Sequence, residues 1–115
     1  GPNKESRDKE LSKIVLDLKE MAKALDVPVV LMSQVSRDVE SRENKRPMLC
    51  DLRETESLES HADAVIMLYR DEYYHPETED RGIAELIVTK HRNGPVGTVK
   101  LLFEPQFTRY RNLAA

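Results

Sequence analysis

Residues 89–103, TKHRNGPVGTVKLLF, join two strand-forming runs through a turn that contains a glycine. Residues 84–89 and 98–103 are rich in β-branched and apolar side chains, which is typical of β-strands. Between them, Asn93-Gly94 is a dipeptide that tight hairpin turns favour, because both residues tolerate positive φ. The stretch therefore predicts a rigid β-hairpin.

Lys90 and Arg92 stand at the end of the first run of this hairpin. They are two positions apart, so on a strand both side chains project from the same face. Two cations held on a rigid hairpin are suited to binding an anion. An edge strand protected by solvated charge explains the same pattern equally well, so both interpretations stand at this point.

Composition and charge limit the classes of protein that this sequence can represent. Its 115 residues, 39% of them hydrophobic, fit one domain with one core. The 18 Lys and Arg against 21 Asp and Glu give a net charge of -3, which excludes a general basic field for nucleic acid. Locally, residues 89–115 contain five Lys and Arg against a single acid, whereas residues 71–80 contain five Asp and Glu and no Lys or Arg.

The cysteine count and the apolar runs point to a soluble protein of a reducing compartment, the cytosol by default. Cys50 is the only cysteine, which excludes an internal disulfide and a cysteine-rich zinc site. The longest apolar run, residues 29–32, is far shorter than the ~20 residues of a membrane span. The three histidines are scattered, so we expect no metal site among them.

Hydrophobic periodicity predicts the order of helices and strands. Residues 9–25 repeat apolar side chains at three- and four-residue spacing, which predicts an amphipathic helix. Residues 29–33 are continuously apolar, as in a strand buried on both faces of a parallel sheet. The remaining predictions are an exposed, mobile loop over 34–47, a short helix over 51–61 N-capped at Cys50-Asp51, a second buried strand over 64–69, a polar loop over 70–82, the hairpin, and a last short strand over 107–110.

This alternation predicts an α/β fold whose sheet is mostly parallel, with an antiparallel pair at its C-terminal edge. Such sheets bind ligands beyond the C-terminal ends of their strands. Gln34 follows the first strand, and its amide can both donate and accept, so it is a candidate contact for a phosphate or a positioned water. A plain surface amide is the alternative, and position alone favours it.

Arg53 and Glu54 lie where the chain enters the short helix, and a cation beside backbone N–H groups suits a phosphate. An adjacent ion pair on a solvated face is equally consistent with the sequence. Asp63, just before a strand, is assigned a structural role. The sequence has neither a G-x-x-x-x-G-K-[ST] loop nor a G-x-G-x-x-G turn, so we expect any phosphate loop to lie upstream or on a neighbouring subunit.

Four blocks in order resemble the C-terminal half of the RecA-like motor domain of DnaB-type replicative DNA helicases. They are residues 29–37, VVLMSQVSR, residues 45–54, KRPMLCDLRE, residues 68–74, LYRDEYY, and residues 90–95, KHRNGP. The resemblance covers almost the whole sequence. It implies a partial RecA-like fold of the P-loop NTPase class, in a hexameric ring that hydrolyses ATP and moves 5′ to 3′ along single-stranded DNA.

The resemblance also implies roles for matching positions. Gln34 resembles the glutamine that senses the γ-phosphate and couples it to the DNA-facing loops. Lys90 and Arg92 resemble the hairpin cations that reach the neighbouring subunit's ATP site. Arg53 and Glu54 match the loop that follows DNA in the central channel. The family usually continues this loop with Ser-Gly, where this sequence has Thr55-Glu56, and it tends to have Asp where this sequence has His61.

By the same resemblance, residues 1–115 are expected to be the C-terminal part of the ATPase domain. The phosphate loop, the catalytic glutamate and the Mg²⁺-binding aspartate are then expected before Gly1. The implied cofactors are ATP and Mg²⁺, with ligands expected in that preceding part. Implied partners are single-stranded DNA, the other copies of the full-length protein in a homo-hexamer, primase and a helicase loader. A bacterial-type cytoplasm is the implied compartment, with a plastid as the alternative.

Two other interpretations remain at this point. The sequence could be a non-catalytic binding or regulatory module that kept half of a RecA-like sheet, in which Lys90 and Arg92 serve a protein partner. The carboxylate of Glu56, which repels phosphate, favours this module slightly. Another RecA-like ATPase, such as a recombination or clock protein, fits residues 46–49 and 92–95 less well.

Overall fold

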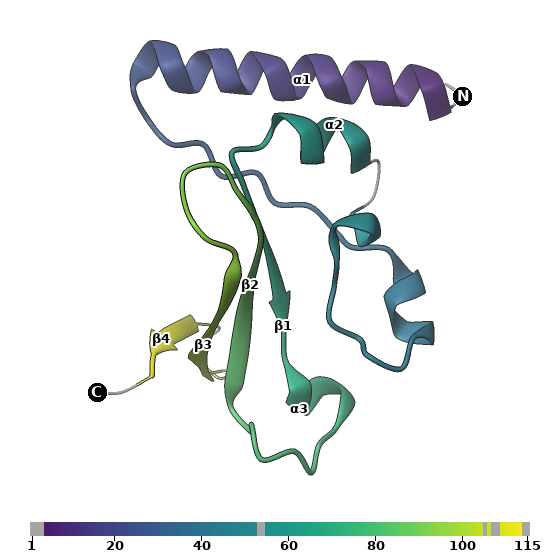
Figure 1. Ribbon diagram of the computed structural model, residues 1–115, viewed down its shortest axis with the longest axis vertical. Helices are drawn as coiled ribbons and strands as arrows, with labels where there is room; N and C mark the ends of the chain where they lie inside the picture. The colour runs from purple at the N-terminus through teal and green to yellow at the C-terminus, as the bar shows by residue number, and fades with distance from the viewer. Residues whose placement is uncertain (1–3, 53–54, 105, 107–108, 114–115) are drawn as a thin grey trace.

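The computed structural model describes residues 4–52, 55–104, 106 and 109–113. A four-stranded sheet in the order β1-β2-β3-β4 forms the lower part of the molecule in Figure 1, and helices α1 and α2 lie across its upper end. The strands are β1 (Ala64–Tyr69), β2 (Ile83–His91), β3 (Gly97–Glu104) and β4 (Arg109–Asn112). The helices are α1 (Lys4–Leu25), α2 (Thr55–His61) and α3 (Asp71–Tyr74), with short 3-10 turns η1 (Arg37–Ser41) and η2 (Leu49–Asp51).

The fold is α/β, but its described sheet is wholly antiparallel. Each strand pairs with its neighbours in the chain, so the sheet is a meander. The prediction of a mostly parallel sheet is wrong for these four strands. Parallel neighbours need long crossover connections, whereas the connections here are loops and short turns that reverse the chain.

The first helix confirms the periodic pattern and begins earlier than expected, at Lys4 rather than residue 9. It ends at Leu25 as predicted, because Asp26 adopts the left-handed conformation with φ of 53°. The N–H of Val27 then donates to the carbonyl of Ala22 at 3.0 Å, which satisfies one of the last free carbonyls of the helix. The helix packs against α2 (Figure 1).

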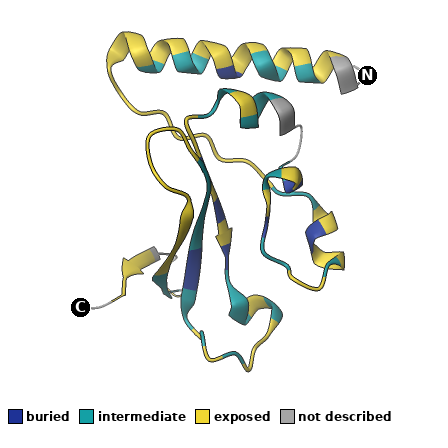
Figure 2. Cartoon of the chain, viewed as in Figure 1, coloured by how far each residue is buried: buried dark blue, intermediate teal, exposed yellow. Residues whose placement is uncertain are grey.

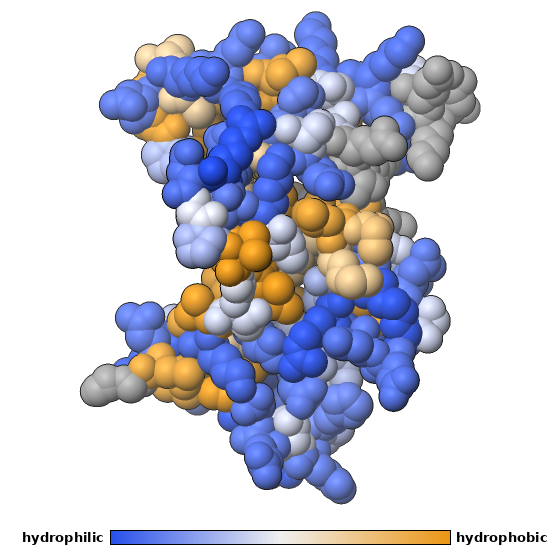
Figure 3. Space-filling view, viewed as in Figure 1, coloured by the Kyte–Doolittle hydropathy of each residue, from blue (hydrophilic) through white to orange (hydrophobic). Residues whose placement is uncertain are grey.

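Residues 29–33 are not a buried strand. They run in extended, irregular backbone after α1, and their side chains are exposed, with Val30 at 87% and Met32 at 89% exposure. A continuous apolar run is buried only when elements cover both of its faces. The described residues supply no such cover, because the meander pairs only within itself. In Figure 3, hydrophobic surface gathers at the waist of the molecule, between the helices and the lower end of the sheet.

The strand over 64–69 is confirmed, although it is buried on one face only. Val65, Met67 and Tyr69 are buried, and the residues between them are exposed, including Ile66 and Leu68. Figure 2 shows this alternation along β1. The predicted buried strand is therefore only half buried, and it has the inward and outward alternation of an antiparallel sheet with one open face.

The hairpin of β2 and β3 is confirmed, with Ile83 opposite Leu102 and Val88 opposite Gly97. The expected reason for Gly94 in the turn, a positive φ, is not what the structure shows. Neither Asn93 nor Gly94 has positive φ. A Cβ on Gly94 would instead lie 2.5 Å from the imidazole of His91, so a side chain at this position requires the exposed imidazole to move.

Candidate functional site

Lys90 and Arg92 lie on the same side of the hairpin, as their spacing predicted. Lys90 is near the C-terminal end of β2, and Arg92 follows the strand directly. The ammonium of Lys90 donates to the carbonyl of Glu59, and Nη2 of Arg92 donates to the carbonyl of Ser60 at 3.3 Å. Both cations thus lie against the C-terminal end of α2, where unpaired carbonyls carry partial negative charge.

Asp63 completes this cluster. Its Oδ1 lies 3.0 Å from Nη1 of Arg92 and 3.2 Å from Nζ of Lys19, which comes from α1. Lys19 also donates to the carbonyl of His61 at 2.8 Å. These contacts hold the pKa of Asp63 below its ordinary value, mainly through the hydrogen bond from Lys19 and less through the charge of Arg92.

The contact between Asp63 and Arg92 follows from the register of β1 against β2, which the sequence alone does not show. Ala64 pairs with His91 in the antiparallel ladder, so the preceding Asp63 must lie opposite Arg92. The backbone agrees, because the N–H of Arg92 donates to the carbonyl of Asp63 at 2.9 Å. Asp63 is therefore structural, as expected, and it also binds a predicted functional cation.

Gln34 is exposed and lies just before a loop whose two ends are joined by backbone contacts. Val35 forms an isolated antiparallel bridge with Leu52, and the N–H of Ser36 donates to the carbonyl of Asp51 at 2.6 Å. The predicted DNA-contacting pair, Arg53 and Glu54, lies outside the described residues. The bridge therefore places Val35, the residue after Gln34, opposite Leu52, the residue just before that pair.

The loop over 34–47 is anchored rather than mobile. Arg42 donates to both carboxylate oxygens of Asp51 at 2.7 Å, and Arg46 donates to both oxygens of Glu85 on β2 at 3.0 and 2.7 Å. Both acids are buried, so each arginine fork pairs a carboxylate that water cannot reach. Sequence periodicity missed this, because Arg46 and Glu85 are 39 positions apart.

Asp51 also caps the 3-10 turn η2 rather than the helix α2. Its Oδ2 accepts the N–H of Met48 at 2.7 Å. The helix was predicted to start at residue 51 with an N-cap at Cys50-Asp51. This start is wrong, since α2 begins at Thr55. The pKa of Asp51 is held below its ordinary value, first by the hydrogen bond from Arg42.

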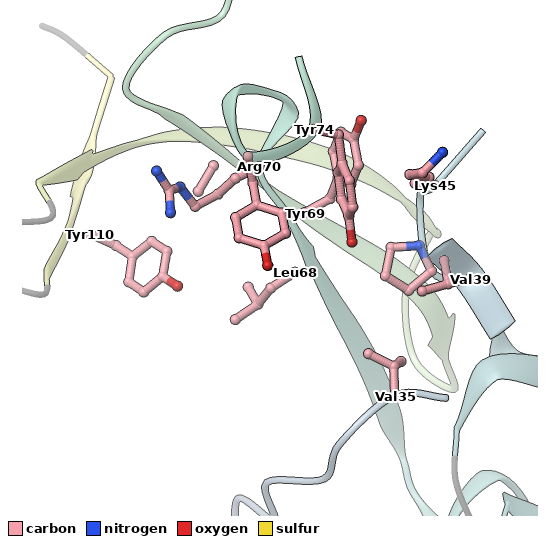
Figure 4. A pocket seen from close by; sticks show the side chains of 11 residues that line it. Val35, Val39, Lys45, Leu68, Tyr69, Arg70, Tyr74 and Tyr110 are labelled. Carbon is pink, nitrogen blue, oxygen red and sulfur yellow. The ribbon is translucent and has the colours of Figure 1, made fainter. Parts of the chain in front are cut away.

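A pocket between η1 and β1 is lined by aromatic and aliphatic side chains (Figure 4). Tyr69 and Tyr74 stack with ring centroids 5.8 Å apart, and the guanidinium of Arg46 lies 4.5 Å from the Tyr69 ring. The Tyr69 hydroxyl donates to Asp71 at 2.7 Å. Burial and this hydrogen bond raise the pKa of Tyr69 to about 12, and the contact of its ring with Arg46 joins the loop to the sheet.

The described residues offer neither a metal centre nor a membrane span. No group of three or more His, Cys, Asp and Glu in that part of the chain is arranged to hold a metal ion. None of the helices in the same residues combines the length and apolar character needed to cross a bilayer.

The chain belongs to the family of DnaB-like helicase C-terminal domains, whose family model matches residues 1–112. It is 50% identical over 113 residues to the replicative DNA helicase DnaC of Bacillus subtilis (strain 168). It is equally similar, 50% over 113 residues, to the replicative DNA helicase DnaB of Geobacillus stearothermophilus. Each match covers 98% of this chain and 25% of the relative, so the chain spans about a quarter of the length of these relatives.

Two solved structures have the same fold over 95% of this chain. One is an ATPase domain, which is 52% identical with a TM-score of 0.89, and the match covers 38% of that chain. A DnaB-like replicative helicase, solved to show its interactions with primase, is also 52% identical with a TM-score of 0.89, and the match covers 27% of it. The predicted family is therefore confirmed, and with it the relation to a RecA-like ATPase domain.

Proposed function

We propose that this chain is part of the motor domain of a replicative DNA helicase. In this proposal the full-length protein forms a hexameric ring that uses ATP to move 5′ to 3′ on single-stranded DNA and unwinds duplex ahead of it. The observation that carries the proposal is the position of Lys90 and Arg92, which lie together at the end of β2 on the same side of the hairpin. The side chain of Arg92 is held by solvent-exposed partners, so a phosphate can replace them.

In trans, Lys90 and Arg92 would neutralise charge that develops on the transferred phosphoryl group of a neighbour's ATP. Arginine suits this task because its guanidinium stays charged and donates through a planar fork. Gln34 would contact the γ-phosphate or the attacking water on its own subunit. The bridge between Val35 and Leu52 would then pass its position to the Arg53-Glu54 loop in the DNA channel.

The donor set of the described residues fits a nucleotide's phosphates but not its metal ion. Lys90 and Arg92 are cations, and no acidic cluster in the described part of the chain could hold Mg²⁺. We therefore place the phosphate loop and the Mg²⁺ ligands in residues outside this chain. Bound ATP and Mg²⁺ supply the phosphoryl group and its charge neutralisation.

We also propose that the exposed segment 29–33 is a strand of a larger, mostly parallel sheet in the full-length protein. Its continuous apolar pattern demands cover on both faces, and residues outside this chain would supply that cover. Single-stranded DNA, primase and a helicase loader are the proposed partners, and a bacterial cytoplasm is the proposed compartment. The bacterial relatives give no support for a plastid.

The test is DNA-stimulated ATP turnover by the full-length protein with Arg92→Ala. We expect the rate to fall by about 10³-fold or more, as when an arginine finger is removed. Arg111→Ala is the matched control, because Arg111 is an exposed arginine that pairs with Glu104 on β3, away from this cluster. An unchanged rate for Arg92→Ala would favour the alternative, a non-catalytic module in which the hairpin cations bind a protein.

A further inference from the structure

Three elements converge on one small polar junction. Lys19 comes from α1, Lys90 and Arg92 come from β2 and its end, and their partners are Asp63 and the last carbonyls of α2. Figure 1 shows the three elements meeting where α2 lies beneath α1 and the hairpin rises toward them. No step of the proposed reaction uses Asp63 or Lys19, so their convergence on Arg92 needs its own explanation.

The two cations at Asp63 share a single oxygen. Arg92 and Lys19 both contact Oδ1, at 3.0 and 3.2 Å. Because one carboxylate cannot fully neutralise two cations, Lys19 weakens the hold of Asp63 on Arg92. The side chain of Asp63 is 67% exposed and that of Arg92 is 46% exposed, so water and salt weaken the pair further. The contact is therefore suited to exchange rather than to permanent anchoring.

We propose that Asp63 is a positioning residue that holds Arg92 on its own subunit and competes with the phosphate of the neighbouring ATP. Lys19 sets the strength of this hold by sharing the same oxygen. The inference rests on the proposed function, because it needs Arg92 to act on a neighbour's nucleotide. It adds a resting place for the cation, defined as the ion pair of Arg92 with Asp63. In this position the guanidinium stays away from the nucleotide until a phosphate replaces the carboxylate.

The location of the resting place gives it a connection to the DNA-facing loop. The helix α2 begins at Thr55, just after the proposed DNA-contacting pair, and its last carbonyls receive Lys90, Arg92 and Lys19. A displacement of this short helix therefore moves the acceptors that hold the cations.

The first test replaces Asp63 in the full-length hexamer by Asn, which keeps the size and an acceptor oxygen but removes the charge. We expect ATP turnover without DNA to rise by about two- to five-fold, the range for an exposed ion pair, and the stimulation by single-stranded DNA to fall by the same factor. Asp63→Glu, which restores the charge, should restore both values. An unchanged or lower turnover in Asp63→Asn would overturn the proposal.

Lys19→Met should change the DNA-independent rate of ATP turnover in the opposite direction. It therefore tests the proposal even if the Asp63→Asn protein fails to assemble. Methionine keeps most of the apolar stem but leaves Asp63 to Arg92 alone, so the DNA-independent rate should fall about two- to five-fold. Lys13→Met on the same helix is the matched control, because Lys13 is exposed and has no part in the junction. An unchanged or raised rate in Lys19→Met would overturn the proposal.

A double variant separates this inference from the proposed function. If Asp63 acts through Arg92, then Asp63→Asn should have no effect in the Arg92→Ala background. An Asp63→Asn effect that persists there would overturn the role of Asp63 while leaving that of Arg92 intact. Failure of the proposed function has a different signature, because Arg92→Ala alone would then leave the turnover rate unchanged.

Discussion

At the scale of single residues, two arginine forks hold the long loop that precedes α2. Arg46 is the more informative fork, since it crosses from the loop to Glu85 on β2 and also covers the ring of Tyr69. The Glu85 side chain is only 7% exposed, so the guanidinium of Arg46 takes the place of water at its carboxylate. Burial of an unpaired carboxylate is strongly unfavourable, which makes the pair sensitive to loss of one member.

Arg46→Met should lower the free energy of unfolding by about 1–3 kcal/mol, because it leaves a buried carboxylate without its charged donor. The double variant Arg46→Met with Glu85→Met should recover part of the loss, since neither charge then remains buried. Urea unfolding measures both changes. Arg111→Met is the control and should change stability by less than about 0.5 kcal/mol. Equal effects of Arg46→Met and Arg111→Met would contradict this account of the fork.

The Asp51 carboxylate gives the loop a dependence on pH with a definite sign. Arg42 holds the pKa of Asp51 below its ordinary value in the folded state. Its contribution to stability is therefore complete above the unfolded pKa and disappears as pH falls through the folded pKa. Wild-type protein should lose more unfolding free energy than Asp51→Asn between neutral pH and about pH 3. Parallel pH profiles of the two proteins in urea unfolding would refute this.

At the scale of elements, the β2–β3 hairpin carries the proposed catalytic cations, and its turn is shaped by Gly94. The imidazole of His91 occupies the space in which a Cβ would stand, and its Nδ1 lies 3.3 Å from the carbonyl of Pro95. Gly97, by contrast, has open space around its would-be Cβ. These two glycines of one hairpin therefore differ in their tolerance of a methyl group.

Gly94→Ala should destabilise the protein by about 1 kcal/mol, because the imidazole must move and give up its contact with Pro95. Gly97→Ala, the matched control, should stay within about 0.5 kcal/mol of wild type. Thermal unfolding of the two variants checks the difference. If Gly97→Ala proved the more damaging of the two, the close approach of His91 would not be the reason for the glycine.

The elements that sequence predicted well are those whose signals are local. The hairpin and the end of the first helix follow from neighbouring residues, such as the apolar runs on either side of the turn. The prediction of a buried strand over 29–33 is wrong for the described residues, because its burial requires other elements to cover it and these residues do not provide them. The sequence analysis also missed the anchored loop and the Asp63 junction, since they depend on pairs such as Arg46 with Glu85 that are far apart in sequence.

At the scale of the whole molecule, two features of the described chain are open to solvent. Its apolar segment 29–33 faces solvent, and Arg92 forms an exposed ion pair with Asp63 on its own subunit. The chain spans about a quarter of the length of its helicase relatives, in line with a site that other residues complete. The proposed role of Lys90 and Arg92 in a neighbour's reaction is thus a statement about the assembled ring.

Mixed rings test that role most directly. One full-length variant would carry Arg92→Ala, and the other would carry a disabled phosphate loop with Arg92 intact; each alone should be inactive. In rings assembled from equal amounts, about a quarter of the interfaces join an intact phosphate loop to an intact Arg92 of the next subunit, so DNA-stimulated ATP turnover should return. Mixed rings as inactive as the two parents would contradict action across the subunit boundary.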